Sequence, residues 1–396
     1  MRSALLLMLI QAQAPAPPAT VQSSAGELRI ERLATLEFPW GMTLLPDGRV
    51  LITEKPGRLR IWANGRLSAP VPGVPRVVYR GTMFEQGGLL DIEADPGFAG
   101  NRLVYFSFSE AADPQPPGAR EPGEPRFGGF VDTTDNIVRG GAVARARLEG
   151  NELRDVQVIW RQEPKTVGRG HFGNRLVFGA DGRLFITSGD RMQFDPAQDL
   201  ATSIGKVLRV NTDGSLPPDN PFAGRHDARG DIWSYGHRNM LAAAVEPGSG
   251  QLWVIEMGPL GGDELNRIER GRNYGWPRVS NGDNYAGQQI PDHATDSTMR
   301  SPVRTWTPVV SASGALFYTG SLFRDWNGSM LAGGLSSKSL IRLTIRGESV
   351  VNEERIELGR RIRDVLQMPD GSLLAIVDDR NGELIRITPA NTRAGR

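Results

Sequence analysis

Residues 46–54 read PDGRVLITE, a turn containing Asp-Gly followed by a run of β-prone residues. The same pattern of turn and then strand recurs in five further segments: 100–108 (GNRLVYFSF), 180–188 (ADGRLFITS), 248–256 (GSGQLWVIE), 327–335 (NGSMLAGGL) and 369–377 (PDGSLLAIV). Each is followed by a second strand-like segment: 57–62 (GRLRIW), 143–148 (VARARL), 205–210 (GKVLRV), 263–268 (DELNRI), 338–343 (KSLIRL) and 382–387 (GELIRI). The chain therefore contains an internal repeat.

The second segments alternate apolar and polar residues, the pattern of a half-buried strand, so each repeat predicts a β-hairpin. A single hairpin cannot bury its own apolar face, but sheets repeated around an axis cover one another. The six repeats therefore predict an all-β fold, a six-bladed β-propeller. A β-sandwich with coincidental turns is the alternative.

Composition excludes several classes of partner and of chemistry. A formal net charge of +1 over 396 residues, with no run of basic residues interleaved with aromatics, argues against a nucleic-acid partner. With 0 cysteines there is no thiolate chemistry, no disulfide framework and no cysteine-bound zinc. A metal bound through oxygen atoms remains compatible with this composition.

The N-terminus reads MRSALLLMLIQAQAPAPPAT, a basic residue and a short apolar run followed by Ala-Gln-Ala, which is typical of an export signal. We expect residues 1–24 to be a signal peptide and Ala/Pro-rich linker, and residues 25–396 to be the propeller, located in the periplasm or secreted. A disordered tail is the alternative. No segment is long enough to span a membrane.

Two histidine-containing segments stand at predicted strand ends. His171 precedes one strand of a hairpin and Asp190 ends the other, so both fall at the same end of one blade. A carboxylate on one imidazole nitrogen raises the basicity of the other, as a general base requires. Arg238 and Asn239, in SYGHRNM, offer donors suited to a carboxylate. A histidine that caps loop carbonyls, and an ordinary surface Arg-Asn pair, are the respective alternatives.

Two further segments carry charge. In EMGPLGGDELNRI (residues 256–268), Glu264 and nearby carbonyl oxygens could bind a hard cation. A polar turn capped by Asp263 is the alternative. In GRRIRDV, Arg361 and Arg363 are two residues apart, which in a strand projects both guanidinium groups onto one face. Two adjacent positive charges favour an anion between them.

Taken together and in this order, the motifs resemble those of the soluble quinoprotein sugar dehydrogenases, the aldose and glucose dehydrogenases that use pyrroloquinoline quinone (PQQ). The resemblance runs from about Leu36 to Ile387. It includes EQGGLLDIEADPGF, GHFGNRLVFGADGRLFITSGD, GKVLRVNTDG, YGHRN, EMGPLGGDELNRI, NYGWP and RIRDV. The family fold is a six-bladed propeller, and the resemblance implies oxidation of aldoses at the anomeric carbon to aldonolactones.

The resemblance also implies residue roles. His171 is similar to the general base, Asp190 to its carboxylate partner, and Arg238 to the group beside the reacting quinone carbonyl. The positions similar to cofactor contacts are Gln86, Arg238, Asn239, Ser336, Arg361 and Arg363. The positions similar to calcium-binding ones are Gly258, Pro259, Glu264 and Tyr274. PQQ and Ca²⁺ are the implied cofactors, and a sugar and an external electron acceptor the implied partners.

The sequence departs from the family pattern at three places. Met257 replaces a polar residue before Gly-Pro, Met240-Leu241-Ala242 replaces Pro-Gln-Gly after Arg-Asn, and Ser336 stands where a lysine is expected, with Lys338 nearby. These changes keep two other hypotheses open: a propeller that binds a ligand without turnover, and a metal-dependent lactonase or hydrolase. The preferred sugar, the natural acceptor and the oligomeric state do not follow from the sequence.

Overall fold

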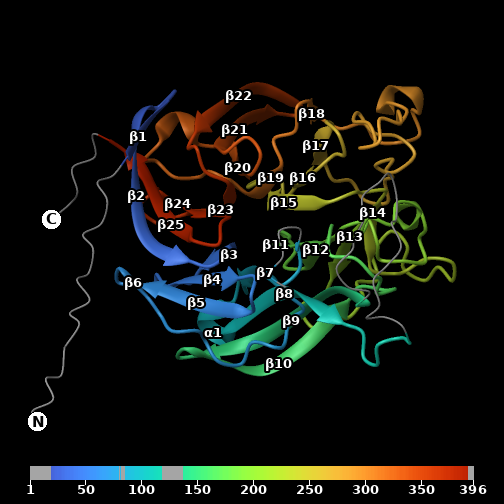
Figure 1. Cartoon of the computed structure of the whole chain (residues 1–396), viewed down its shortest axis with the longest axis horizontal. Helices are drawn as coiled ribbons and strands as arrows, with labels where there is room; N and C mark the ends of the chain where they lie inside the picture. The colour runs from blue at the N-terminus through green and yellow to red at the C-terminus, as the bar shows by residue number, and fades with distance from the viewer. Residues whose placement is uncertain (1–18, 80, 82–84, 118–136, 391–396) are drawn as a thin grey trace, which may run out of the picture.

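The computed structural model describes residues 19–79, 81, 85–117 and 137–390. The chain forms six antiparallel sheets around a central axis, with consecutive blades following one another in chain order (Figure 1). The structure confirms the predicted all-β, six-bladed β-propeller and not the sandwich. Each blade is one of these sheets, and we number the blades in chain order.

The strands are distributed over the blades as follows. Blade 1 holds β3 (Pro39–Leu44), β4 (Val50–Glu54), β5 (Arg58–Ala63) and β6 (Arg66–Leu67). Blade 2 holds β7 (Leu89–Ala94), β8 (Leu103–Ala111), β9 (Arg139–Glu149) and β10 (Glu152–Arg161). Blade 3 holds β11 (Gly173–Phe178), β12 (Leu184–Ser188), β13 (Lys206–Val210) and β14 (Ile232–Tyr235). Blade 4 holds β15 (Met240–Val245), β16 (Leu252–Glu256), β17 (Asp263–Arg267) and β18 (Arg304–Trp306).

The remaining strands complete the ring. Blade 5 holds β19 (Ala312–Phe317), β20 (Met330–Gly334), β21 (Ser339–Arg346) and β22 (Ser349–Glu357). Blade 6 holds β23 (Ile362–Gln367), β24 (Leu373–Val377) and β25 (Gly382–Pro389), and adds β2 (Gly26–Leu36) and β1 (Ala19–Ser23) from the start of the described chain. The helical elements of the described residues are α1 (Phe98–Asn101) and the 3-10 turns η1 (Asp195–Ala197), η2 (His293–Thr295) and η3 (Arg324–Trp326).

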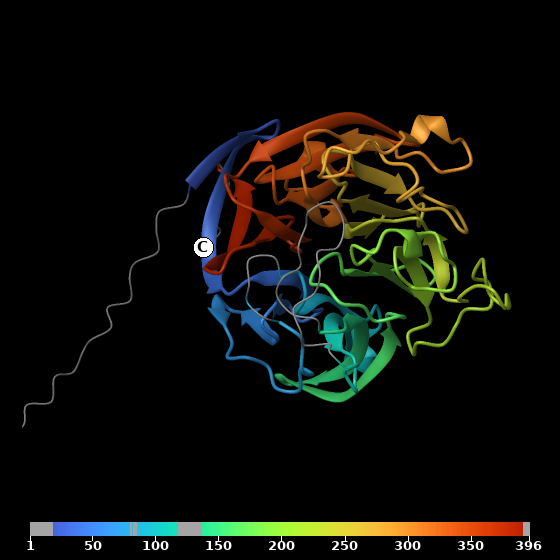
Figure 2. The same cartoon turned by 45° about the vertical axis from the view of Figure 1, so that its right-hand side comes forward.

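Blade 6 closes the ring by joining the two ends of the described chain. β2 pairs antiparallel with β25, from Leu28 opposite Pro389 to Leu36 opposite Gly382 (Figure 2). The first strands of the blades contact one another around the axis, and β23 contacts β3 to complete the circle. Closure of this kind leaves no long sheet edge unpaired at the junction.

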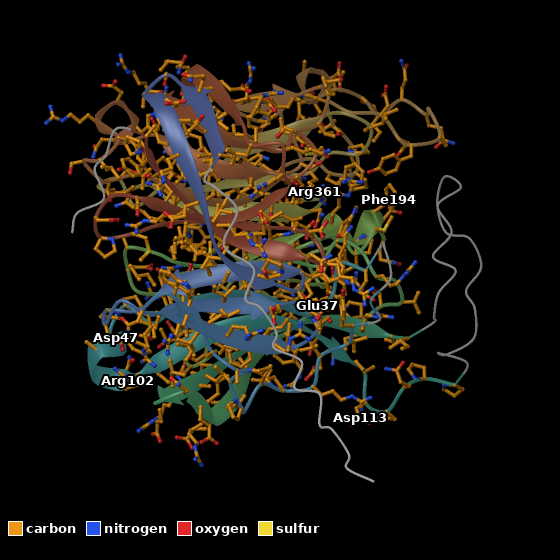
Figure 3. All side chains as sticks on the ribbon, turned by 60° about the vertical axis from the view of Figure 1, so that its left-hand side comes forward. Glu37, Asp47, Arg102, Asp113, Phe194 and Arg361 are labelled. Carbon is orange, nitrogen blue, oxygen red and sulfur yellow. The ribbon has the colours of Figure 1, made fainter. Side chains whose placement is uncertain are left out.

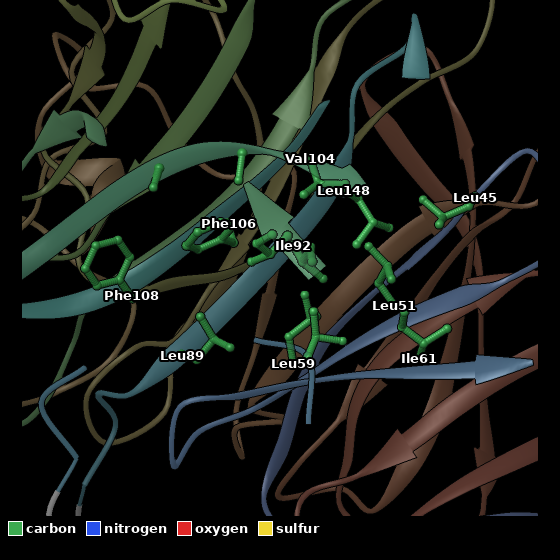
Figure 4. Packing of buried hydrophobic residues seen from close by; sticks show 14 of the residues in the cluster. Leu45, Leu51, Leu59, Ile61, Leu89, Ile92, Val104, Phe106, Phe108 and Leu148 are labelled. Carbon is green, nitrogen blue, oxygen red and sulfur yellow. The ribbon is translucent and has the colours of Figure 1, made fainter. Parts of the chain in front are cut away.

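Apolar residues of adjacent blades pack face to face and hold the ring together. Between blades 1 and 2, for example, Leu51 and Ile61 pack with Ile92, Phe106 and Leu148, all of them buried (Figure 4). Each strand alternates the faces it presents, so both faces of every sheet meet an apolar neighbour. This arrangement accounts for the largely buried second strands of the blades, such as β4 and β12.

Arg175 of β11 lies at the axis, where it contacts a residue from every other blade. Its guanidinium donates to the Asp91 carboxylate at 2.8 Å and to the Leu241 carbonyl at 2.8 Å. The partners from the five other blades are Trp40, Asp91, Leu241, Ser313 and Arg363. One buried cation therefore links all six blades at the centre of the ring.

A register shift occurs between the first and second strands of every blade. Such irregularities bend a strand and change the direction of its side chains. In β11 the shift lies between Gly173 and Leu176, close to the start of the strand. The repeated shifts therefore occur at the end of the propeller where the first strands begin and the second strands finish, called here the site face.

The site face lies opposite the turns that join first to second strands. Figure 3 shows Phe194 and Arg361 toward one side of the molecule and Asp47 and Arg102 toward the other. Asp47 lies in the β3–β4 turn and Arg102 just before β8, whereas Arg361 immediately precedes β23. The two sets of loops therefore emerge on opposite faces.

The N-terminal region differs in part from the prediction. The expected linker extended to residue 24, but Ala19–Ser23 forms β1, which pairs with β2 at the edge of blade 6. This part belongs to the fold because it adds a hydrogen-bonded strand to that sheet. Residues 1–18, which include the predicted export signal, lie outside the described residues. Among the described helices, none is long and apolar enough to cross a membrane.

Candidate active site

The predicted site residues lie at the same structural position in different blades. Gln86, His171, Arg238 and Arg361 precede the first strands of blades 2, 3, 4 and 6. Asp190, Gly258 and Ser336 follow the second strands of blades 3, 4 and 5. Since both positions open onto the site face, the fold places residues that are far apart in sequence at one end of the propeller.

His171 and Asp190 form a hydrogen-bonded pair. The Nδ1 atom of His171 lies 2.7 Å from Oδ1 of Asp190, and both side chains are buried. The second oxygen of Asp190 accepts a hydrogen bond from Nε1 of Trp276 at 2.7 Å. Because an ionised carboxylate can only accept, it fixes the proton on Nδ1 and leaves Nε2 of His171 as the basic nitrogen.

The electrostatic surroundings keep this pair in the state that a base requires. Burial and the positive charge of Arg238 lower the pKa of His171, and together they outweigh the opposing effect of Asp190. Burial alone would raise the pKa of Asp190, but His171 and Arg238 bring it below its ordinary value. At neutral pH the imidazole is therefore neutral and the carboxylate ionised.

Arg238 connects the histidine to the loop after β16. Its backbone carbonyl accepts a hydrogen bond from Asp190 N at 2.7 Å, and its Nη1 donates to the carbonyls of Met257 and Gly258 at 2.9 and 2.8 Å. The guanidinium carbon lies 5.2 Å from the ring centroid of Trp276. Its buried Nε has no hydrogen-bond partner among the described residues, so one donor remains for another group.

Gln86 and Asn239 are held beside this pair in different ways. Gln86 is exposed, and its Oε1 accepts from the backbone N–H of His171 at 2.8 Å. Asn239 is buried, and its Oδ1 has no hydrogen-bond partner within the part of the chain that the structure describes. Both amides lie on the site face, as their strand positions require.

Arg361 and Arg363 differ in exposure, although their guanidinium groups meet at one carboxylate. Arg361 precedes β23 and is exposed, whereas Arg363 lies at the register shift of that strand and is buried. Both guanidinium groups nevertheless reach Oδ2 of Asp378, at 2.8 and 3.0 Å. The anion between the two arginines is thus supplied, in this structure, by the protein itself.

Ser336 lies in the turn after β20, and its Oγ is 2.5 Å from Oγ of Ser311. Lys338, proposed from the sequence as a substitute for a lysine at this position, is exposed and begins the turn into β21 with a positive φ of 52°. No hydrogen bond or ion pair links its ammonium to the described site residues. Serine therefore contributes a hydroxyl and no charge at this position.

Three of the predicted metal-binding residues, Gly258, Glu264 and Tyr274, line one small cavity of about 10 Å³, and Pro259 is not among its lining residues. The Gly258 carbonyl already accepts from Arg238, and the Glu264 carboxylate accepts from His293 Nε2 at 3.0 Å and Asn266 Nδ2 at 3.3 Å. Burial raises the pKa of Glu264. In the described part of the chain, no three acidic, histidine or cysteine side chains form a metal-binding group. The available donors are oxygen atoms, which suit a hard cation.

The apolar replacements have a packing role. Leu241 is buried in a cluster with Trp40, Leu90 and Phe172, and Met257 packs against that cluster. The four clustered residues come from blades 1 to 4, so the cluster spans the axis beneath the arginines. Met257 and Leu241 therefore form part of a packed floor, which does not by itself favour loss of turnover.

Sequence reasoning missed several residues of this face. Trp276 belongs to NYGWP, but nothing in that motif indicates that its indole holds Asp190. Asp378 directly follows the strand 373–377, one position earlier in the repeat than Asp190, which lies two residues after 184–188. Lys55 directly follows segment 46–54, the position that Asp378 has after segment 369–377. His293, which pairs with Glu264, lies in an irregular loop and carried no signal.

Comparison with known proteins identifies the family and supports the fold. The sequence model of a family described as Glucose / Sorbosone dehydrogenase matches residues 36–386. A relative from Escherichia coli, aldose sugar dehydrogenase YliI, is 38% identical over 364 residues, covering 90% of this chain and 91% of its own. Quinoprotein glucose dehydrogenase B of Acinetobacter calcoaceticus is 26% identical, covering 89% of this chain and 85% of its own. The crystal structure of a soluble aldose sugar dehydrogenase from Escherichia coli, in the apo form, matches with a TM-score of 0.81 and 38% identity, covering 91% of this chain and 99% of the other.

Proposed function

The chain belongs to the glucose/sorbosone dehydrogenase family, and we propose that it oxidises aldose sugars at the anomeric carbon to aldonolactones, with PQQ and calcium as cofactors and His171 as general base. The observation that carries the proposal is the buried His171–Asp190 pair at 2.7 Å, next to Arg238. The product, both cofactors and the residue roles are parts of the proposal. The relative named as a quinoprotein supports the choice of cofactor.

His171 would take the proton of the anomeric hydroxyl. Asp190 holds Nδ1, so Nε2 is the atom that accepts, and the lowered pKa of His171 keeps it unprotonated at neutral pH. After the transfer, Asp190 stabilises the imidazolium and Trp276 keeps the carboxylate oriented. When bound, the quinone would supply the redox chemistry, as the acceptor of the hydride from the same carbon.

The residues present fit an acidic, polar quinone. PQQ carries three carboxylates, and Arg238, Arg361 and Arg363 place three guanidinium groups on the site face. The Nε atoms of Arg238 and Arg363 and Oδ1 of Asn239 are buried without partners among the described residues, which leaves polar capacity for a ligand. Gln86 and Ser336 would add neutral contacts. Arg238 would stabilise negative charge on the reduced cofactor.

The oxygen donors of the pocket around Gly258 fit calcium. The carbonyls of Gly258 and Pro259, the carboxylate of Glu264 and the backbone of Tyr274 would hold the ion. The Gly258 carbonyl accepts from Arg238 in this structure, so this hydrogen bond would have to loosen for the carbonyl to hold an ion. We also propose that the protein is exported to the periplasm or beyond, and that it passes its electrons to an external acceptor.

A titration tests this proposal. Purified apoprotein is titrated with PQQ and calcium, and dye reduction is then measured with a panel of aldoses. Saturable quinone binding and sugar-dependent reduction are the expected results. Sugar-lactone hydrolysis by the metal-loaded protein without quinone would support the lactonase alternative instead. Absence of quinone binding would contradict the proposed function.

A further inference from the structure

Lys55 lies on the site face of blade 1, directly after β4, and its ammonium group is enclosed. The residue is 8% exposed, and Nζ donates to the backbone carbonyl of Glu85 at 3.3 Å. The same nitrogen lies 5.0 Å from the ring centroid of Phe38 and 6.0 Å from that of Tyr79. One carbonyl and two aromatic faces do not neutralise a buried ammonium, which usually has an anionic partner.

The charges around Lys55 are unbalanced. Lys55 interacts electrostatically with Arg361, Arg363, Asp378 and Glu85. The Glu85 carboxylate is paired with the buried guanidinium of Arg139 at 3.2 Å. Asp378 is therefore the carboxylate that interacts with all three cations, and Arg361 and Arg363 already contact its Oδ2.

Arg363 provides a second and independent indication of a missing anion. It is buried, and its Nε has no hydrogen-bond partner among the described residues. A buried guanidinium normally satisfies its donors, because an unpaired buried donor is costly. The unpaired Nε of Arg363 and the surplus positive charge around Lys55 therefore lie in the same group of residues.

We infer that Lys55, Arg361 and Arg363, called here the Lys55 cluster, form a carboxylate-binding site that holds an acidic group of the quinone cofactor. This inference rests on the proposed function and adds Lys55 to it. Lys55 comes from blade 1, whereas the two arginines come from blade 6, so the site spans the junction at which the ring closes. A ligand carboxylate there would balance the cations that Asp378 alone does not.

The titration of Lys55 supports this assignment. Burial and, after it, the positive charge of Arg363 lower the pKa of Lys55 to about 8. The groups that face the ammonium are Asp378, Glu85, Arg361, Arg363 and Tyr79. The pKa of Tyr79 is raised to about 12, chiefly by burial, so this phenol stays neutral while Lys55 titrates. A bound carboxylate favours the charged ammonium, and affinity should fall as pH rises through about 8.

The first experiment measures the affinity of apoprotein for PQQ by tryptophan fluorescence, at fixed calcium and pH 7. Lys55→Met should weaken binding by about ten- to a hundredfold, the usual range for a hydrogen bond to a charged group. Lys165→Met is the matched control, since Lys165 pairs with Glu110 and lies outside the Lys55 cluster. PQQ trimethyl ester, which lacks the carboxylates, should bind the wild type and Lys55→Met alike.

The second experiment compares the wild type with Lys55→Arg between pH 7 and 9.5. Arginine stays charged over this range, so the variant should keep its affinity while that of the wild type declines. This comparison also tests whether the charge of Lys55 contributes to binding if Lys55→Met does not fold. Equal decline in both proteins would overturn the inference.

The outcomes separate this inference from the proposed function. If the wild type binds PQQ and Lys55→Met binds it equally well, Lys55 has no part in the site and the proposed function stands. If the wild type does not bind PQQ at all, the proposed function fails, and the role of the Lys55 cluster fails with it. Weaker binding of both the acid and the ester by Lys55→Met would indicate a structural role and overturn the charge-based site.

Discussion

Blades 3 and 4 each contain a histidine paired with an acidic residue at the site face, and in both blades 19 residues separate the two partners. His171 Nδ1 lies 2.7 Å from Asp190, and His237 Nδ1 lies 3.0 Å from Glu256. Both histidines precede a first strand, but Glu256 is the last residue of β16, whereas Asp190 lies two residues beyond β12. The two blades therefore carry the same kind of pair at neighbouring positions.

The two histidine pairs differ in the partner of the second ring nitrogen, Nε2. His237 is fully buried, its Nε2 is 2.8 Å from Oγ of Ser234, and its ring stacks on Tyr274 with centroids 4.6 Å apart. Nε2 of His171 has no hydrogen-bond partner in the described part of the chain. The comparison teaches that the pair alone does not make a base, because an occupied second nitrogen turns the same pair into a structural element.

Replacement of His171 should have the largest effect on turnover. His171→Ala should lower kcat by about a hundred- to ten-thousandfold, the usual contribution of a general base, while PQQ affinity stays close to that of the wild type. Dye reduction and fluorescence titration measure the two quantities. His226→Ala, at an exposed histidine, is the control. Full activity in His171→Ala would remove the distinction between the two pairs.

Replacement of His237 should instead lower stability. His237→Ala leaves the buried Glu256 carboxylate without the hydrogen bond from His237, and removing one partner of a buried polar group costs about 1–3 kcal/mol. The free energy of unfolding, from denaturant titration followed by circular dichroism, should fall by that amount. His171→Ala should change it less. A loss below about 1 kcal/mol for His237→Ala would show that its network is not structural.

The pH profile sharpens the comparison further. His171 acts as a base when it is neutral, so kcat/KM should rise with pH through the pKa of His171, which burial and Arg238 hold below 6.5. Below that midpoint the rate should fall about tenfold per pH unit. Asp190→Asn removes the charge that favours the imidazolium and should move the midpoint to lower pH. A midpoint above pH 7 would contradict this assignment.

The smallest effect should come from Trp276. Trp276→Phe removes the N–H that orients Asp190 at 2.7 Å but keeps most of the aromatic packing. We expect kcat to fall by about tenfold, the lower end of what one hydrogen bond to a charged group contributes. Trp253→Phe is the matched control, since its buried Nε1 has no partner among the described residues. Equal losses in both variants would show that the effect arises from packing.

The repeat in the sequence predicted the middle strands of the blades but not the others. The six predicted hairpins correspond to the second and third strands, such as β4 with β5 and β24 with β25. These strands have turn signals and a clear apolar pattern. The first strands interrupt that pattern at their register shifts, and the outer strands are exposed on one side, as in β22. Their pairing depends on neighbouring blades and is not encoded locally.

In the site, too, contacts within one hairpin were predictable from the sequence and contacts between distant segments were not. His171 and Asp190 flank one hairpin, so the local sequence was enough to bring them together. Arg361 and Arg363 were expected on one face, and both reach Asp378, but strand spacing did not indicate that Arg363 is buried while Arg361 is exposed. Asp378 flanks one hairpin with the two arginines, as Asp190 does with His171. The contact of Trp276 with Asp190 joins segments 86 residues apart, which strand spacing does not predict.

The sequence by itself determined the fold class, the number of blades and the family, because turn chemistry and apolar alternation act over a few residues and recur six times. Only the tertiary structure decided which histidine keeps a free nitrogen, which carboxylate the arginines share and where Lys55 lies. These features depend on what ring closure brings next to each side chain. Burial and pairing across blades are properties of the closed ring, and a single strand does not contain them.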